Sequence, residues 1–298
     1  MPGMPNEVCT PCRPADTLER PVFEVPAGAC DAHMHVFESR DVYPSIAAPN
    51  YTLPDGRLDH YLRLMPVIGI DKFVIVQPSF YGTDNACLLD ALSRAGNRAR
   101  GVVMVEPDIA DAELARFHAA GVRGVRLDLF KRAALPRDEI IAYIRAMAAK
   151  VGPLGWHLQF YTPGAIIRDI IDFLAGLEIP FVIDHMGYML EKDGLNDGDF
   201  DRMLDLLRHG NGWLKLSGPY RLARHSSMEA VDAIASAIVV AAPHKALWGS
   251  DWPHIPDGDC DTGGILNMLA DWAPDPAVRK AILVDNPRKL FDFANGTA

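Results

Sequence analysis

Two histidines one residue apart stand near the start of the chain, in the stretch CDAHMHVF at residues 30–37. Alternate side chains of an extended strand point to the same side. The imidazoles of His33 and His35 would therefore face one way and Met34 the other. Such a pair could hold a metal ion or a substrate oxygen, or its spacing could be accidental.

A histidine and an aspartate later in the chain offer matching groups. His185 follows the short apolar run PFVID, and Asp251 stands in GSDWPH. An acid between the apolar segments ALW and WP is costly to bury without a task. Imidazole and carboxylate groups are ligands for divalent metals, so these two residues could form one site with the histidine pair.

The elements that must position these residues follow a regular pattern. Short apolar runs alternate with longer amphipathic stretches, which is typical of strands alternating with helices. The pattern predicts eight strands, at 29–35, 72–77, 101–107, 124–130, 156–161, 180–184, 212–218 and 245–251. It predicts helices at 83–96, 111–120, 136–150, 163–175, 198–208, 227–242, 263–272 and 276–293.

Eight strand–helix units without a Ser/Gly-rich linker predict one α/β domain, a (β/α)8 TIM barrel over residues 26–298. Residues 1–25 are polar and proline-rich, and we expect an irregular N-terminal arm there. Chemistry in such a barrel sits at the carboxyl ends of the strands, so polar residues scattered in sequence converge there. Those residues are His33, His35, Ser79, Arg126, Asp128, Arg132, His157, Gln159, Tyr161, His185, Lys215, Ser217, Arg221, Asp251 and His254.

Composition excludes several kinds of partner. Of 298 residues, 49% are hydrophobic and 23% charged, as in an ordinary globular protein with a large core. The formal charge of −10 makes a nucleic-acid partner improbable, and no apolar run approaches the roughly 20 residues that span a bilayer. The first residues lack the basic and apolar regions of a signal peptide, so we expect a cytoplasmic protein.

Eight sequence blocks resemble the amidohydrolase superfamily, in which an HxH on the first strand, a later histidine and an aspartate on the eighth strand surround a metal and a hydrolytic water. Within it, they resemble the 2-pyrone-4,6-dicarboxylate lactonase family. The blocks run in that family's order from about residue 29 to residue 291. They are CDAHMHVF, VIVQPSFYGTDN, GVRGVRLDLFKR, GWHLQFY, IDHMG, LKLSGPYRL, LWGSDWPH and DNPRKLF.

The resemblance implies hydrolysis of a small anionic lactone, as in the breakdown of aromatic compounds. Asp251 would be the general base on the attacking water. His33, His35 and His185 would polarise the lactone carbonyl. The resemblance implies substrate-binding positions at Tyr51, Ser79, Arg126, Arg132, Tyr161, Tyr188 and Arg221.

Two positions depart from the family's pattern. The family continues IDHMG with an arginine that binds carboxylate, and this chain has Tyr188 there. Asp128 stands where the family tends to have a neutral asparagine. Both changes predict a substrate less anionic than a pyrone dicarboxylate, such as a mono-carboxylated lactone or a sugar lactone.

The resemblance leaves the metal open. Members of the superfamily usually bind a metal, whereas the lactonase family uses the same residues directly, so we expect no required cofactor. The alternative is a single zinc ion held by His33, His35, His185 and Asp251. Other readings are a zinc-dependent hydrolase or decarboxylase, a sugar-acid lactonase, or a barrel that only binds an anionic metabolite. The sequence predicts no oligomeric state.

Overall fold

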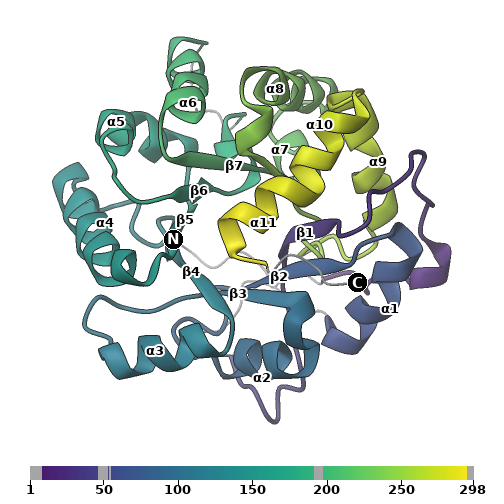
Figure 1. Cartoon of the computed structure of the whole chain (residues 1–298), viewed down its shortest axis with the longest axis horizontal. Coiled ribbons are helices and arrows are strands. Elements are labelled where there is room, and N and C mark those ends of the chain that lie inside the picture. Colours follow the sequence, from purple (N-terminus) through teal and green to yellow (C-terminus); the bar gives the residue numbers. More distant parts are fainter. Residues whose placement is uncertain (1–8, 46–52, 54, 191–196, 294–298) are drawn as a thin grey trace.

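Eight parallel strands form the centre of the molecule in a computed structural model that describes residues 9–45, 53, 55–190 and 197–293. Each strand pairs with the next along the chain, and a bridge between Met34 and Trp252 joins the two edges (Figure 1). The predicted (β/α)8 barrel is confirmed. The strands are β1 (Cys30–Met34), β2 (Lys72–Val76), β3 (Ala99–Val103), β4 (Val122–Asp128), β5 (His157–Tyr161), β6 (Phe181–Ile183), β7 (Gly212–Leu216) and β8 (Ala246–Trp248).

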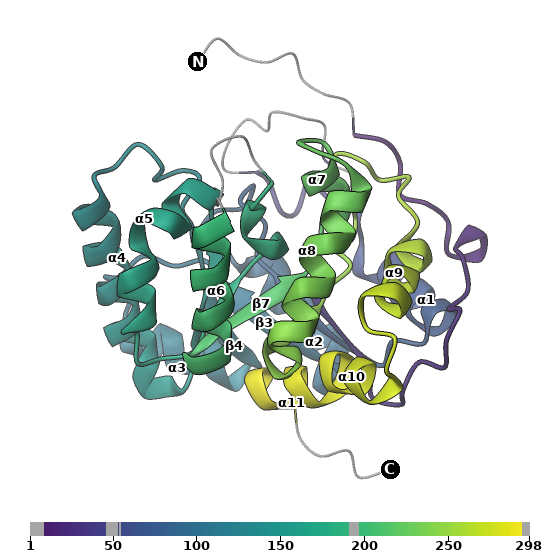
Figure 2. The same ribbon diagram turned by 90° about the horizontal axis from the view of Figure 1, so that it is seen from above.

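Helices surround this barrel, and α11 crosses it at one end (Figures 1 and 2). They are α1 (Leu58–Ile68), α2 (Ala86–Ala95), α3 (Asp111–Ala119), α4 (Arg137–Val151), α5 (Gly164–Ala175), α6 (Asp197–His209), α7 (Pro219–Ala223), α8 (Met228–Ala241), α9 (Thr262–Trp272), α10 (Pro276–Lys280) and α11 (Asn286–Phe291). Among the helices of the described residues, none is long and apolar enough to cross a membrane.

Helices α1 and α7 were not predicted from the sequence, and the single helix predicted at 276–293 is two helices in the structure. Helix α1 begins without a side-chain cap and contains Pro66, so only its stop signal, the left-handed Gly69, is of the usual kind. The short α7 follows β7 directly. The predicted helix at 276–293 is divided, because a wider turn at Ala281–Asp285 separates α10 from α11.

The barrel interior is apolar at its amino-terminal end. Cys30, Val74, Val182 and Leu247 pack there in one cluster, and Phe291 of α11 closes it from outside. A second, larger apolar cluster lies between the strands and the surrounding helices. His157 is a buried polar residue at this end, with its ring 5.2 Å from that of Phe291, and the candidate site lies at the opposite end, where the strands finish.

The described part of the N-terminal segment lies against the region after β8. It contains one turn of 3-10 helix at Ala15–Thr17. Arg13 forms an ion pair with Asp261 at 3.1 Å, and the backbone N–H of Val22 donates to Asn267. A domain boundary near residue 25 stays a prediction.

Candidate active site

The histidine pair faces the inside of the barrel because β1 contains an irregularity. Ala32 belongs to the interior apolar cluster, and the pairing of β1 with β2 shifts between Asp31 and Met34. A bulge of this kind changes the phase of the side-chain alternation. His33 can therefore point inward directly after Ala32. The Nε2 atoms of His33 and His35 lie 3.3 Å apart, as expected for side chains on one face.

The hydrogen bonding of His35 fixes which nitrogen carries its proton. Its Nδ1 lies 2.8 Å from the backbone oxygen of Val76, and a carbonyl can only accept. In the neutral ring Nδ1 therefore donates, and Nε2 presents a lone pair. That lone pair lies 3.4 Å from Oδ1 of Asp251, which is also an acceptor. A proton, a water molecule or a cation must satisfy both atoms.

Backbone hydrogen bonds attach the loop of Asp251 to the histidine strand. The N–H of Asp251 donates to the carbonyl of His33, and the N–H of His35 donates to the carbonyl of Trp252, both at 2.8 Å. Asp251 has a φ of 60°, a left-handed conformation that is uncommon outside glycine. The loop therefore holds the carboxylate in a fixed position beside the imidazoles.

The two oxygens of Asp251 have different surroundings. Oδ2 accepts hydrogen bonds from the Tyr220 hydroxyl at 2.5 Å and from Nε of Arg221 at 2.6 Å. Oδ1 is buried and has no hydrogen-bond partner among the described residues. It lies 3.7, 3.4 and 3.8 Å from Nε2 of His33, His35 and His185. Oδ1 is thus the oxygen directed at the reacting group.

His33, His35, His185 and Asp251 form a histidine–aspartate cluster. His185 belongs to an unusual turn that follows β6. His185, Met186 and Tyr188 have φ values of 50°, 49° and 50°, and left-handed backbone at residues other than glycine costs on the order of 1–3 kcal/mol. Nδ1 of His185 lies 3.0 Å from the hydroxyl of Ser217. The turn and this contact together direct Nε2 at Asp251.

A second buried carboxylate lies behind His33. Oδ1 of Asp184 is 3.3 Å from Nδ1 of His33 and 3.4 Å from Nζ of Lys215. Its Oδ2 accepts from the Gln159 amide at 3.0 Å and lies 3.6 Å from Nε of Arg126. This layer holds His33 from the side opposite to Asp251.

Burial and neighbouring charges fix the protonation states. Burial lowers the pKa of His185 to about 4 and also lowers the pKa values of His33 and His35. Burial alone would raise the pKa of Asp251, but the charge of Arg221 outweighs it and holds that pKa well below its usual range. Near neutral pH the site therefore combines an ionised carboxylate with neutral imidazoles.

Several predicted substrate-binding residues lie around the cluster. The Arg126 guanidinium stacks over the Tyr161 ring at 4.3 Å and donates to the carbonyl of Gln77. The rings of Tyr161 and Tyr188 are 6.0 Å apart, and each also lies close to Phe130. These three rings form an aromatic wall beside His185.

Asp128 at the end of β4 lies next to another predicted binding residue. The hydroxyl of Ser79 donates to Oδ2 of Asp128 at 2.7 Å, and the backbone N–H of Lys131 donates to Oδ1. Asp128 is buried. The Ser79 hydroxyl is thus already engaged by a carboxylate.

Arg132, which was predicted to bind substrate, contacts residues outside the histidine–aspartate cluster. Its guanidinium pairs with Glu106 at 3.1 Å and lies over the ring of Tyr143. Its role in substrate binding stays a prediction. Tyr51, also predicted to bind substrate, lies outside the described residues.

Three residues that shape the site were given no role from the sequence. Asp184 directly precedes His185, and Tyr220 directly precedes Arg221. In both pairs only the second residue was assigned a role from the sequence. Asp31 accepts from the backbone of His33 and Ser250 and from the Tyr61 hydroxyl. The only signal for Asp31 and Asp184 was a carboxylate next to a strand-end histidine.

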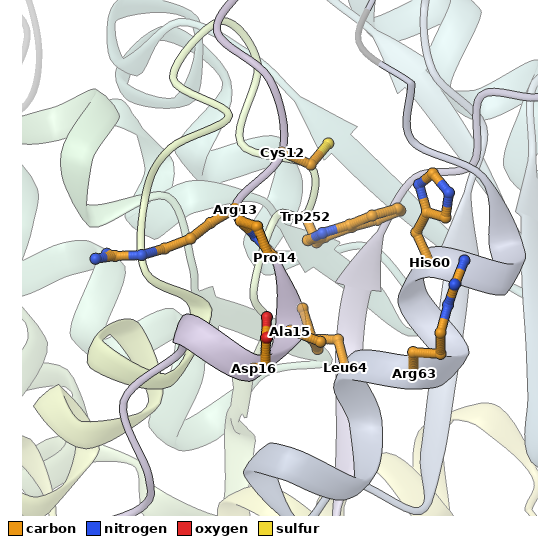
Figure 3. Close-up of a pocket in the computed structure, with 9 residues that line it drawn as sticks. All are labelled: Cys12, Arg13, Pro14, Ala15, Asp16, His60, Arg63, Leu64 and Trp252. Carbon is orange, nitrogen blue, oxygen red and sulfur yellow. The ribbon is translucent and has the colours of Figure 1, made fainter.

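A cavity of about 450 Å³ lies elsewhere, between the N-terminal segment and α1 (Figure 3). Arg13, His60, Arg63 and Trp252 are among its lining residues. Trp252 follows Asp251 directly, but none of the cluster residues lines this cavity. The cavity therefore takes no part in the chemistry derived below.

Comparisons with known proteins agree with the class of protein that the barrel and its histidine–aspartate cluster define. The profile described as Amidohydrolase matches residues 30–293. The chain is 34% identical to 2-pyrone-4,6-dicarboxylate hydrolase of Comamonas testosteroni, over 91% of this chain and 92% of that protein. It is 35% identical to 4-sulfomuconolactone hydrolase of Rhizobium radiobacter, over 94% of this chain and 96% of that protein.

A solved structure agrees with these relatives. The crystal structure described as a putative 2-pyrone-4,6-dicarboxylic acid hydrolase from Pseudomonas putida matches with a TM-score of 0.78 and 34% identity, covering 91% of this chain and 100% of the other. The chain belongs to the amidohydrolase family, many of whose members depend on a metal.

Proposed function

We propose that this protein hydrolyses a carboxylated lactone, with Asp251 directing a water molecule at the lactone carbonyl. The observation that carries the proposal is the buried Oδ1 of Asp251, which lacks a hydrogen-bond partner among the described residues and faces three imidazoles. The two relatives named above are described as hydrolases of a pyrone dicarboxylate and of a sulfomuconolactone, which supports a lactone as the substrate.

The reaction begins when Asp251 takes a proton from water and the water oxygen bonds to the carbonyl carbon. The resulting oxyanion collapses, and the bond from the carbonyl carbon to the ring oxygen breaks. The proton held by Asp251 then passes to the leaving oxygen. One open-chain product forms, with a new carboxyl group and a hydroxyl or enol group.

The three imidazoles have different roles in this reaction. An N–H donor aimed at the oxyanion lowers the barrier by about 3 kcal/mol, and a neutral His33 or His185 can supply one from Nε2. His35 cannot do so while neutral, because its Nδ1 proton is donated to Val76. Its Nε2 lone pair suits it to accept a hydrogen from the attacking water or to bind a metal ion.

The charges around the cluster favour a substrate with few anionic groups. Arg221 already pairs with Asp251 at 2.6 Å, and Arg126 lies 3.6 Å from Asp184. Asp128 adds a further buried carboxylate, and Tyr188 contributes a ring but no positive charge. We therefore propose a lactone with a single carboxylate whose flat ring packs against the aromatic wall.

A single divalent metal ion also fits three residues of the cluster, His33, His35 and Asp251, whose ligand atoms lie within 4.8 Å of one another. The ligand atoms of these three residues are 3.3 to 3.7 Å apart. Ligands about 2.0–2.2 Å from a tetrahedral zinc ion have a spacing of roughly 3.3–3.6 Å. The ion would be held by His33, His35 and Asp251, with Nε2 of His185 3.8 Å from Oδ1 of the same aspartate, and it would supply Lewis-acid activation of the carbonyl or the water. The Nδ1 hydrogen bond of His35 to a carbonyl is typical of metal-bound histidine.

Measurements of metal content and of activity with a chelator distinguish metal-free hydrolysis from zinc-dependent hydrolysis. We keep direct action of the residues as the working form, with no required cofactor. Turnover by protein shown to contain less than a tenth of an equivalent of zinc, manganese or iron supports it. Loss of activity with a chelator and recovery with zinc would replace it by the zinc-dependent form. A cytoplasmic location stays a prediction.

The substrate class is tested by ring opening of three lactones followed by ultraviolet absorbance. We expect kcat/KM for muconolactone, which has one carboxylate, to exceed that for 2-pyrone-4,6-dicarboxylate and for 4-sulfomuconolactone by about tenfold. Asp128→Asn removes one negative charge with little change in shape, and it should raise kcat/KM for the two dianions. Faster turnover of a dianion by the wild type would contradict the single-carboxylate class, and no turnover of any lactone by folded protein would contradict the proposed function.

A further inference from the structure

Two neighbouring groups of side chains in the barrel have the composition of metal ligands, and they share one residue. The first is His33, His35 and Asp251, and the second is His33, Asp184 and His185. Within each group the ligand atoms lie within 4.8 Å of one another, and all members are buried. Adjacent groups of this kind are the arrangement that two-metal hydrolases use.

A lysine side chain enters the second group from β7. Nζ of Lys215 lies 3.4 Å from Oδ1 of Asp184 and 3.3 Å from Nδ1 of His33. It also donates to Oε1 of Gln159 at 2.8 Å. The side chain has no exposed surface, so this ammonium group is a fixed part of the interior.

We propose that Lys215 is a positioning residue that serves as the built-in cation of the second group and limits the barrel to one divalent metal ion at most. Its ammonium group supplies the positive charge at Oδ1 of the buried Asp184 carboxylate, while Arg126 lies 3.6 Å from Oδ2. The ammonium group also lies within contact distance of two of the three atoms a second ion would use. A divalent ion there would meet a like charge at close range in a poorly screened interior.

The proposal goes beyond the proposed function and does not depend on which lactone is the substrate. It concerns only how many ions the cluster accepts, whether the wild type holds one ion or none. Metal content measures it without any activity assay, so its failure and the failure of the lactone hydrolase proposal can be told apart.

The test is the zinc content of Lys215→Met, which keeps the length of the side chain and removes its charge. Full-length wild type and variant are stripped with a chelator, incubated with excess zinc, passed through a desalting column and analysed by mass spectrometry. We expect at most one zinc per wild-type chain and one more in Lys215→Met than in the wild type. The double variant Lys215→Met/Asp184→Asn should lose the additional ion.

Lys245→Met is the matched control, because Lys245 lies over the ring of Trp213 and away from the cluster. It should bind as much zinc as the wild type. Equal zinc content in folded Lys215→Met and wild type would overturn the proposal, since removing the charge would then have opened no site. Should Lys215→Met fail to fold, a cobalt titration of the wild type decides, and a second tightly bound ion would overturn the proposal.

Discussion

At the scale of single residues, the chemistry depends on the unequal surroundings of the two oxygens of Asp251. Tyr220 and Arg221 hold Oδ2, and this leaves Oδ1 for the reacting group. A carboxylate held by two donors loses its freedom to rotate. Its charge is also stabilised, which keeps it ionised among buried imidazoles.

Tyr220→Phe tests this arrangement at Oδ2. The variant removes one hydrogen bond to an ionised group, and such bonds contribute about 1.5–3 kcal/mol. We expect kcat to fall by about tenfold or more while the fold is kept, because Arg221 still holds the same oxygen. Tyr143→Phe is the matched control, since Tyr143 packs against Arg132 outside the cluster. Equal rates for Tyr220→Phe and wild type, measured at saturating substrate, would show that Oδ2 needs no hydroxyl donor.

At the scale of elements, the site depends on where regular structure is interrupted. The irregularity in β1 turns His33 inward, and left-handed residues after β6 and β8 direct His185 and Asp251. In a regular strand side chains alternate, so His33, which follows the inward-facing Ala32, would have pointed outward to the surrounding helices. Such local departures concentrate where function requires them.

Gly249, just after β8, tests how closely these elements must approach. A Cβ at this position would lie 2.6 Å from Cβ of His33 and 3.1 Å from its backbone nitrogen. Gly249→Ala should therefore displace β1, lower the free energy of unfolding by about 1–3 kcal/mol and reduce kcat. Urea unfolding and steady-state kinetics measure the two effects.

Gly176→Ala is the control for this substitution, because the nearest atom to its Cβ would be a backbone oxygen 3.7 Å away. It should leave both stability and turnover close to the wild-type values. Wild-type kinetics in Gly249→Ala would contradict a tight contact between β8 and the histidine strand.

At the scale of the whole molecule, buried histidines connect the stability of the barrel to pH. Burial lowers the pKa of His157 to about 3 and the pKa values of His185 and His254 to about 4, from an ordinary value of 6.5. Below pH 6.5 the unfolded chain takes up protons that the folded chain does not. Stability is therefore fully present above pH 6.5 and is lost as the pH falls toward 4.

We accordingly predict a lower free energy of unfolding at pH 5.0 than at pH 7.5. Each histidine contributes up to about 1.4 kcal/mol for each pH unit below 6.5, until its own folded pKa is reached. Urea unfolding at the two pH values, at constant ionic strength, measures the difference. The same unfolding midpoint and slope at both values would contradict neutral, buried histidines in the folded protein.

Much of the barrel follows from the sequence, because fully buried parallel strands leave short β-branched runs between amphipathic helices. The four cluster residues could be named because His33 and His35 alternate along a strand, His185 follows the apolar run PFVID and Asp251 is an acid between apolar segments. Boundaries were less predictable. The run GVVMVEP extended the third predicted strand beyond Val103, because Met104 and Val105 are buried without being in the strand.

The contacts of the charged residues around the cluster could not be predicted from the sequence. Whether Arg132 faces the site or Glu106 depends on loop geometry, and a charged residue in a loop carries no signal of its direction. Lys215 and Asp184 meet only because β6 and β7 are neighbours in the barrel. Contacts of this kind depend on register and on bulges, which periodicity does not encode.

The most direct test of the central claim is a single turnover of muconolactone in water enriched in oxygen-18, with wild type and Asp251→Asn. Attack of water on the carbonyl predicts one labelled oxygen in the new carboxyl group of the wild-type product. Asp251→Asn should lower the rate by a thousandfold or more, on the order of 4 kcal/mol in the barrier. A ring-opened product without the label, a decarboxylated or isomerised product, or an undiminished rate in folded Asp251→Asn would contradict Asp251-directed hydrolysis.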